Sequence, residues 1–342
     1  MKIFSLAFLL LFVYPFVFPI TDSQQKLNKN KSGVANIVFK STDGGQSWQD
    51  ISEGLPENLQ KDSIRGNSFF ANDKGLFLRL GNGLYHSAPN ATAPFWTKEI
   101  FRDECSSIAS GTSGIVTNNY WGINLKKSDG TSVWSPIFEN FHEPRIRTVF
   151  ETAGGAIFIG IDRGFFKTIN SGNTWKHVHA GGLVGHLAES DGVLLATSMR
   201  RIIRSTDNGE NWAVVTTEGS VVFDIKPIKG GFAAITAGSE SGTRSLMTSY
   251  DAGKTWQPID AGDKVFIDSI WRTWDDRPRV QAFGTSIIQV GENFICTHPD
   301  GIFRSSDKGK TWKFLLPSVE DKVFNVFVSG NVIYAIPSKG GC

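Results

Sequence analysis

One segment of the chain, residues 263–284, combines aromatic and charged side chains in a way that is typical of a binding loop. It contains Trp271 and Trp274, two of the three tryptophans that lie outside the sequence repeat described below. The charged residues around these indoles are Arg272, Asp275, Asp276, Arg277 and Arg279. Tryptophan and arginine are enriched at interface hot spots, so the segment is predicted to bind a partner. The alternative is that the two indoles pack over a neighbouring part of the fold and the charges are solvated.

Further arginines recur between the repeated units and are interleaved with acidic residues. These arginines are Arg145, Arg163, Arg200, Arg201 and Arg244. The whole chain has 35 basic and 33 acidic residues and a net charge of +2, so nucleic acid is not expected as a partner. A local arginine-rich surface on a nearly neutral chain favours recognition of a protein or a glycan, with ordinary solvated loop charge as the alternative.

The residues that catalysis or metal binding would require do not gather in the sequence. No HExxH, GxSxG or P-loop pattern is present. The six histidines are scattered, although His177 and His179 alternate on one strand face. Because two ligands do not make a metal site, we expect neither a metal nor another cofactor.

A repeated eight-residue pattern, S-x-D-x-G-x-T-W, must position these residues. Four copies begin at Ser41, Ser205, Ser249 and Ser305, and a fifth copy at Thr168 has Asn in place of Asp. The Asp or Asn side chain can accept hydrogen bonds from amides further round a turn, and the Gly can adopt a positive φ. Each copy is therefore predicted to be a structural hairpin between two strands. The scaffold residues of these hairpins are Asp43, Gly45, Trp48, Asn170, Gly172, Trp175, Asp207, Gly209, Trp212, Asp251, Gly253, Trp256, Asp307, Gly309 and Trp312.

The spacing of the repeat predicts the fold. With two degenerate copies that end at Trp96 and Trp134, the anchor tryptophans run from Trp48 to Trp312 with a mean step of 44 residues. A four-stranded propeller blade takes about 40–45 residues. We therefore expect an all-β protein, a single seven-bladed β-propeller over residues 25–342, as a monomer. The N- and C-terminal strands are expected to share one blade and close the ring, which leaves no unpaired sheet edge.

The pattern resembles the Asp-box, or BNR, repeat of sialidases, sortilin-type receptors and photosystem II stability/assembly factors. This resemblance implies a propeller scaffold and leaves function open, because enzymes and binding proteins share the hairpin. A sialidase-like site would use three arginines, a Tyr–Glu pair and an Asp, with an Arg-Ile-Pro-type motif that is missing near residues 26–50. We expect a non-catalytic binding or assembly propeller that recognises a protein or glycan through one face of the ring. A sialidase-like glycoside hydrolase is the alternative.

The N-terminus has the order of a secretory signal. Lys2 precedes an uncharged apolar run over residues 3–20, and polar residues follow. We expect a signal peptide over residues 1–24 and a secreted, periplasmic or cell-surface protein. An uncleaved membrane anchor is the alternative, although Pro15 and Pro19 would disturb a membrane-spanning helix.

Overall fold

The structure is a computed structural model that describes most of the repeat region. The described residues are 37–56, 69–72, 75–80, 83–88, 90–99, 105–111, 114–119, 124–127, 134–136, 147–199, 201–215, 220–238, 244–259, 286–319 and 322–338, with backbone alone over 105–136. The expected signal segment lies outside them. None of these residues forms a helix long and apolar enough to cross a membrane.

The described chain is all-β, and most of its sheets are blades of four consecutive antiparallel strands. The first two blades are β3 (Phe69–Asn72), β4 (Gly75–Leu80), β5 (Gly83–Ser87) and β6 (Thr97–Lys98), then β7 (Cys105–Gly111), β8 (Gly114–Asn119), β9 (Asn124–Lys127) and β10 (Trp134–Pro136). The next two are β11 (Thr148–Glu151), β12 (Ile157–Ile161), β13 (Gly164–Thr168) and β14 (Lys176–His179), then β15 (Val184–Ser190), β16 (Val193–Ser198), β17 (Arg201–Ser205) and β18 (Ala213–Val214). The last two are β19 (Ser220–Ile228), β20 (Gly231–Gly238), β21 (Arg244–Ser249) and β22 (Gln257–Pro258), then β23 (Ile287–Val290), β24 (Asn293–His298), β25 (Gly301–Ser305) and β26 (Lys313–Pro317).

The two ends of the chain form one further four-stranded sheet. It joins β1 (Phe39–Ser41) and β2 (Gln49–Asp50) to β27 (Val323–Ser329) and β28 (Val332–Ser338) in the order β2-β1-β28-β27. Phe39 pairs with Ala335 and Lys40 with Tyr334, so the expected sharing of a sheet by both chain ends is present.

The expected count of seven blades needs correction. Within the described residues the chain builds six blades from uninterrupted runs of four strands, not seven. Counting tryptophan anchors gives one more unit, because Trp48 belongs to the sheet of β1, β2, β27 and β28. We call it the composite sheet, since no single stretch of the chain forms it.

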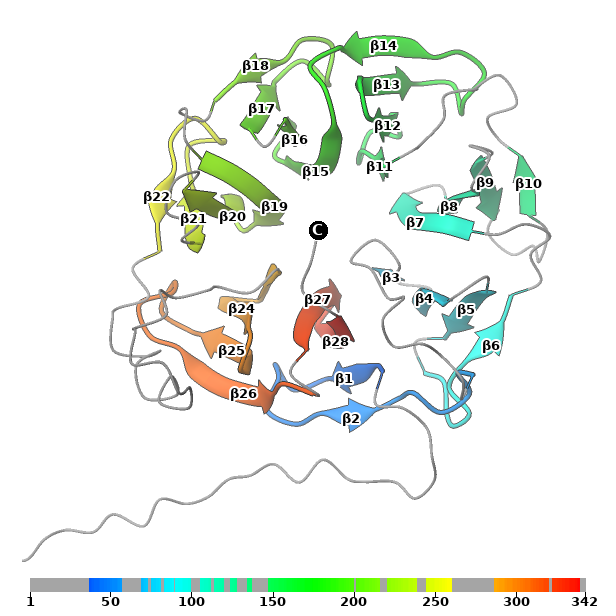
Figure 1. Cartoon of the computed structure of the whole chain (residues 1–342), viewed down its shortest axis with the longest axis vertical. Helices are drawn as coiled ribbons and strands as arrows, with labels where there is room; N and C mark the ends of the chain where they lie inside the picture. The colour runs from blue at the N-terminus through cyan, green and yellow to red at the C-terminus, as the bar shows by residue number, and fades with distance from the viewer. Residues whose placement is uncertain are drawn as a thin grey trace, which may run out of the picture.

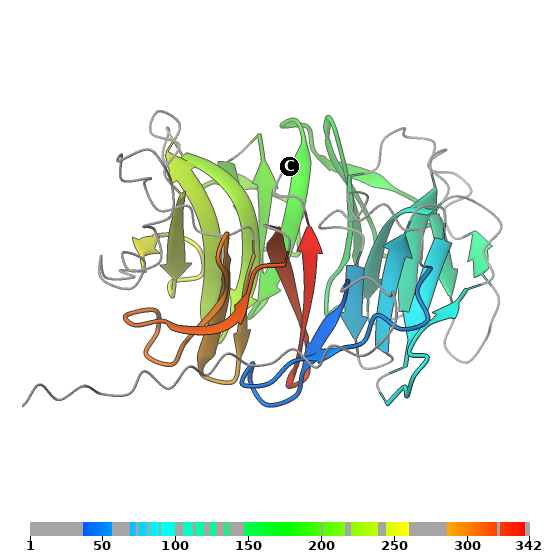
Figure 2. The same ribbon diagram turned by 60° about the horizontal axis from the view of Figure 1, so that its bottom comes forward.

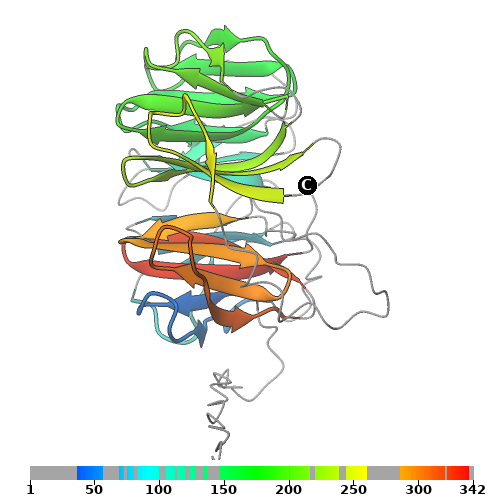
Figure 3. The ribbon, with the colours of Figure 1, turned by 90° about the vertical axis from the view of Figure 1, so that its left-hand side faces the viewer.

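The sheets stand around a central axis, and each presents its first strand to that axis. β3, β7, β11, β15, β19 and β27 lie nearest the centre in Figure 1, and β23 takes the equivalent end of its sheet. The strands run between two opposite faces of the ring (Figures 2 and 3). The repeat turns join third to fourth strands and lie at one face, which we call the box face. The turns between second and third strands and the connections between blades lie at the other, which we call the linker face.

The repeat turns, or boxes, are held by the hydrogen bonds that the sequence pattern predicts. In the box that follows β21, the Ser249 hydroxyl donates to Asp251 Oδ1 over 2.8 Å and accepts from Gly253 N over 2.9 Å. The Asp251 carboxylate also accepts from Thr255 N over 2.9 Å and from Thr255 Oγ1 over 2.6 Å. Gly253 has φ +80°, as the positive-φ expectation requires. The other four boxes repeat this arrangement around Asp43, Asn170, Asp207 and Asp307.

Four of the five box turns also contact the preceding sheet through their glycine, and this contact helps to fix the blades in the ring. A Cβ placed on Gly309 would lie 1.9 Å from Ile259 Cγ2, so only a glycine lets this turn approach the preceding blade so closely. A basic side chain from the preceding third strand adds a polar contact. Arg204 Nε donates to the Ala252 carbonyl over 2.7 Å, and Arg304 donates to the Gly44 carbonyl over 3.4 Å. The last contact joins residues from opposite ends of the chain and helps to close the ring.

Candidate functional site

The arginines expected to bind a partner can be placed only in part. Arg163 lies in the turn between β12 and β13, and Arg201 and Arg244 begin β17 and β21, so all three positions are at the linker face. The other members of the predicted set lie outside the described residues: Arg145, Arg200, Trp271, Arg272, Trp274, Asp275, Asp276, Arg277 and Arg279. Their role stays a prediction.

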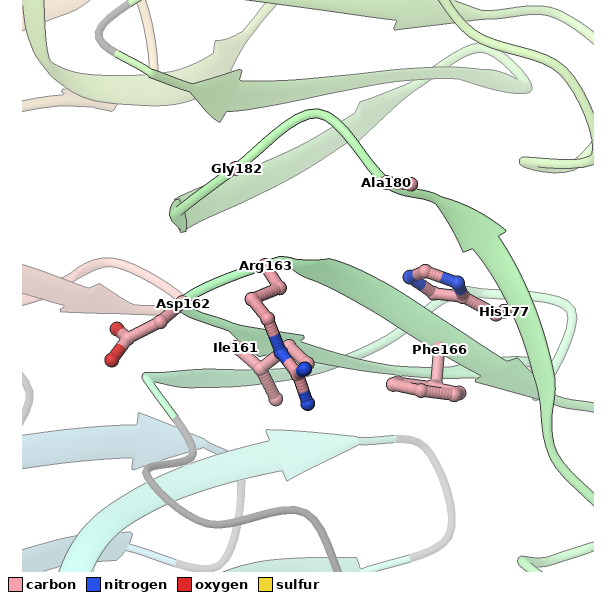
Figure 4. A pocket seen from close by; sticks show the side chains of 7 residues that line it. All are labelled: Ile161, Asp162, Arg163, Phe166, His177, Ala180 and Gly182. Atoms are coloured by element: carbon pink, nitrogen blue, oxygen red, sulfur yellow. The ribbon is translucent and has the colours of Figure 1, made fainter.

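A hollow opens at the linker face beside Arg163, and we call it the linker-face hollow. Its volume is about 570 Å³, and Figure 4 shows its lining. The lining residues are Ile161, Asp162, Arg163, Phe166, His177, Ala180 and Gly182. They come from the end of β12, the β12–β13 turn, β13, β14 and the connection to β15. One blade and its connection to the next blade therefore form the site. A hollow of this size accepts one or two side chains of a partner.

The polar groups of the linker-face hollow are arranged around an aromatic stack. The rings of Phe166 and His177, paired across β13 and β14, lie 4.6 Å apart with planes inclined by 25°. At the rim, Arg147 Nε donates to Asp162 Oδ1 over 2.6 Å, and this hydrogen bond raises the pKa of the Arg147 guanidinium. Arg163 is exposed and lies between Asp162 and the stack in Figure 4. The site therefore offers aromatic surface, an imidazole and a guanidinium to one ligand group.

The two histidines of β14 do not act as a pair. His177 stacks on Phe166 in the hollow, whereas His179 Nε2 lies 3.0 Å from the Ser198 hydroxyl. Burial lowers the pKa of His179, and the neighbouring charge of His177 lowers it further. Among the described residues, no group of three or more His, Cys, Asp or Glu side chains is placed to hold a metal ion.

Exposed apolar side chains adjoin the hollow and were not anticipated from the sequence. Met199 is 64% exposed and Leu183 is 42% exposed, and Met199 N donates to the Leu183 carbonyl over 3.1 Å. Met199 has φ +48°, a conformation that is strained for a residue with a Cβ and that often accompanies function. The only sequence signal was a methionine in a tight turn where Asn or Gly is usual.

A polar cluster on the inner strands was also not predicted from the sequence. Asp224 on β19 is almost fully buried, and its Oδ1 lies 3.3 Å from Lys226 Nζ and 3.4 Å from His186 Nδ1 on β15. Enclosure within the ring lowers the pKa of His186, and the Asp224 charge opposes this shift. An acid within the apolar run of residues 221–225 was the available signal.

The described residues do not assemble the tyrosine part of a sialidase-like site at the axis. Tyr85 lies on β5, Tyr334 on β28, and Tyr250 directly follows β21. None of these described tyrosines is on an innermost strand. Tyr120 lies outside the described residues.

Comparison with known proteins finds similarity in structure alone. No protein-family model matches the chain, and no curated protein matches it. A solved structure of YCF48 bound to D1 peptide is similar with a TM-score of 0.54 and 13% identity, covering 81% of this chain and 95% of that one. YCF48 from Cyanidioschyzon merolae is similar with a TM-score of 0.56 and 13% identity, covering 79% and 94% of the two chains.

A larger protein contains a similar propeller. The extracellular domain of BT4673 from B. thetaiotaomicron gives a TM-score of 0.60 at 9% identity, covering 91% of this chain. The present chain spans 39% of the length of that protein's chain. At these identities the comparisons show that the chain has a β-propeller fold.

Proposed function

We propose that this chain is an exported, non-catalytic binding propeller of the Asp-box type that recognises a protein or glycan partner through its linker face. The observation that carries the proposal is the linker-face hollow, where Arg163 lies beside the Phe166–His177 stack. Exposed Met199 and Leu183 extend it with apolar surface. Methionine and arginine are among the residue types enriched at protein interfaces.

The remaining parts of the proposal have separate support. The signal-like residues 1–24 support export, and similarity to an extracellular domain agrees with it. The hydrogen bonds of the five boxes support the Asp-box type. A propeller of similar fold has been solved with a bound peptide, which favours a protein partner over a glycan. The segment 263–284 with Trp271 and Trp274 remains a proposed part of the same interface.

The proposal is tested by comparing variants of the two faces. The tagged chain is used to capture its partner from the exported fraction of its source, and Arg163→Ala with Met199→Asp is compared with Lys254→Ala. Asp tolerates a positive φ, so the Met199 change should not disturb the turn. Lys254 is an exposed cation in a box, on the opposite face, and serves as the control.

We expect the double variant to reduce capture by about tenfold or more, since removal of one hot-spot residue costs about 2 kcal/mol. The Lys254 variant should capture as the parent chain does. Equal capture by all three proteins would place the interface elsewhere. Hydrolysis of fluorogenic sialosides by the purified chain would favour the glycosidase alternative.

A further inference from the structure

A second hollow lies on the box face, between the β15–β18 and β19–β22 blades, and we call it the box-face hollow. Its volume is about 320 Å³. Asp191 from the β15–β16 turn forms one side, Gly230 from the β19–β20 turn forms another, and Tyr250 and Asp251 from the box after β21 complete it. The hollow is on the opposite face from the linker-face hollow, so it is a separate site.

Tyr250 supplies an exposed aromatic surface that the box does not need. It occupies the second box position, where other boxes have Thr42, Thr206 and Ser306, and no hydrogen bond of the box involves its ring. The residue is 53% exposed. Because about half of the Tyr250 side chain is exposed, part of its ring is accessible to a ligand.

The ring of Tyr250 already attracts a cation within the protein. Lys308 Nζ, from the box of the next blade, lies 5.9 Å from the centre of the ring. Lys308 approaches from the β23–β26 blade, whereas Asp191 belongs to the β15–β18 blade. Lys308 and Asp191 therefore come from the two blades on either side of the blade that carries Tyr250, and Asp191 shares the box-face hollow with Tyr250.

Two carboxylates line the box-face hollow. Asp251 is held ionised because hydrogen bonds from the Thr255 hydroxyl and amide lower its pKa far below the usual range. Its oxygens are largely occupied by the box. Asp191 is exposed and accepts one long hydrogen bond, 3.4 Å, from the Ser190 hydroxyl. A carboxylate has about four acceptor positions, so Asp191 retains capacity for a further donor group.

We propose that the box-face hollow binds an arginine side chain of a partner protein, with the guanidinium stacked on Tyr250 and hydrogen-bonded to Asp191. An arginine satisfies both groups at once, because its planar guanidinium stacks on aromatic rings and donates two parallel hydrogen bonds to a carboxylate. A lysine ammonium would make the charge contact without the stack. A neutral ligand would gain less from the two negative charges of the site.

The test measures binding of a short probe to the full chain by isothermal titration calorimetry. The probe is the capped peptide acetyl-Gly-Arg-Gly-amide, and the same peptide with citrulline in place of arginine is its neutral isostere. The variants are Asp191→Asn and Tyr250→Thr, the latter placing in this box a residue that two other boxes carry. Glu292→Gln is the matched control, because Glu292 is an exposed acid of the same face that pairs with Lys229 outside the hollow.

We expect the arginine peptide to bind about tenfold or more tightly than the citrulline peptide, because only the former makes a charge-assisted pair. Each hollow variant should weaken arginine binding by about fivefold or more, and the Glu292 control by less than about twofold. Binding that is absent in the parent chain, equal for both peptides or insensitive to Asp191→Asn would overturn the proposal. Arg163→Ala should leave this binding unchanged, so its outcome is separate from that of the linker-face interface.

Discussion

The contact between a box glycine and the preceding blade can be tested by adding one methyl group. Gly309 lies in the box after β25 and has φ +91°. A Cβ on Gly309 would lie 1.9 Å from Ile259 Cγ2, and Ile259 is a buried residue just beyond β22 of the preceding blade. Neither atom can move far, because Ile259 packs in the core between the two blades. The substitution Gly309→Ala therefore forces a clash as well as an unfavourable backbone conformation.

The loss of stability should have two parts that a control can separate. The left-handed conformation costs a residue with a Cβ about 1–2 kcal/mol. An extra carbon in a packed core costs about 1–3 kcal/mol. Gly291, in the β23–β24 turn of the same blade, has φ +58° and no atom within 4 Å of an added Cβ. Gly291→Ala should therefore cost only the conformational part, about 1 kcal/mol, whereas Gly309→Ala should cost about 3 kcal/mol.

Urea unfolding followed by circular dichroism gives both free energies, provided that the slope m is unchanged. The double variant Gly309→Ala with Ile259→Ala removes the opposing methyl group. Relative to Ile259→Ala alone, the added alanine should cost about as little as Gly291→Ala does. Equal destabilisation by Gly309→Ala and Gly291→Ala in the parent chain would refute the view that inter-blade contact, rather than backbone conformation, requires glycine in the box.

Three further predictions concern charges and a thiol. Lys167 is buried and donates to Glu210 Oε1 over 2.6 Å. Glu210→Gln should therefore lower the free energy of unfolding in urea by about 1–3 kcal/mol. Lys176→Ala removes an exposed partner of the same acid and should lower it by less than about 1 kcal/mol. Hydrogen bonds from the Thr311 hydroxyl and amide lower the pKa of Asp307 to about 2 from 3.8. The stability that this carboxylate adds is therefore present above pH 3.8 and is lost as the pH falls toward 2, so the difference between the parent chain and Asp307→Asn should shrink in acid-dependent melting curves. Cys296 is a buried cysteine on β24, and a thiol reagent should modify it only after denaturant is added; modification at the same rate in the folded chain would contradict its burial.

The scaffold could be predicted from the sequence because each box is a local structure. Its hydrogen bonds join residues at most four positions apart, so the spacing in the pattern is enough to specify them. Contacts between residues far apart in the sequence could not be predicted from the pattern. The spacing groups Trp96 with the box anchors, yet its indole Nε1 donates over 2.6 Å to the carbonyl of Ile51, which lies 45 residues away and directly after β2. The anchor count gave seven units for the same reason, since spacing along the chain does not distinguish an uninterrupted blade from a composite sheet.

The candidate sites depend on features that no sequence pattern contains. The pairing of β13 with β14 shifts its register between Phe165 and Phe166, beside the pair formed by Phe166 and His177. A bulge also precedes Asp224 on β19, and bulges re-aim side chains toward sites without a change in composition. The sequence predicted Arg163 as a binding residue, and the structure has it in a turn of the linker face because turns alternate between the two faces in every blade. It did not indicate which apolar residues would remain exposed there.

The box pattern itself explains where new function can arise on the ring. Positions one, three, five and seven of the box are committed to its own hydrogen bonds, and the glycine also contacts the preceding blade. Position two has no such role, and its residues include Ile169, 76% exposed, and Tyr250, 53% exposed. Position six is less constrained: Gln46 donates to the Asp43 carbonyl within its own box, whereas Glu210 accepts from Lys167 of the preceding blade. Substitutions at these positions change the surface without altering the turn, so the box face can acquire binding residues such as Tyr250 while the same eight-residue structure continues to hold the blades together.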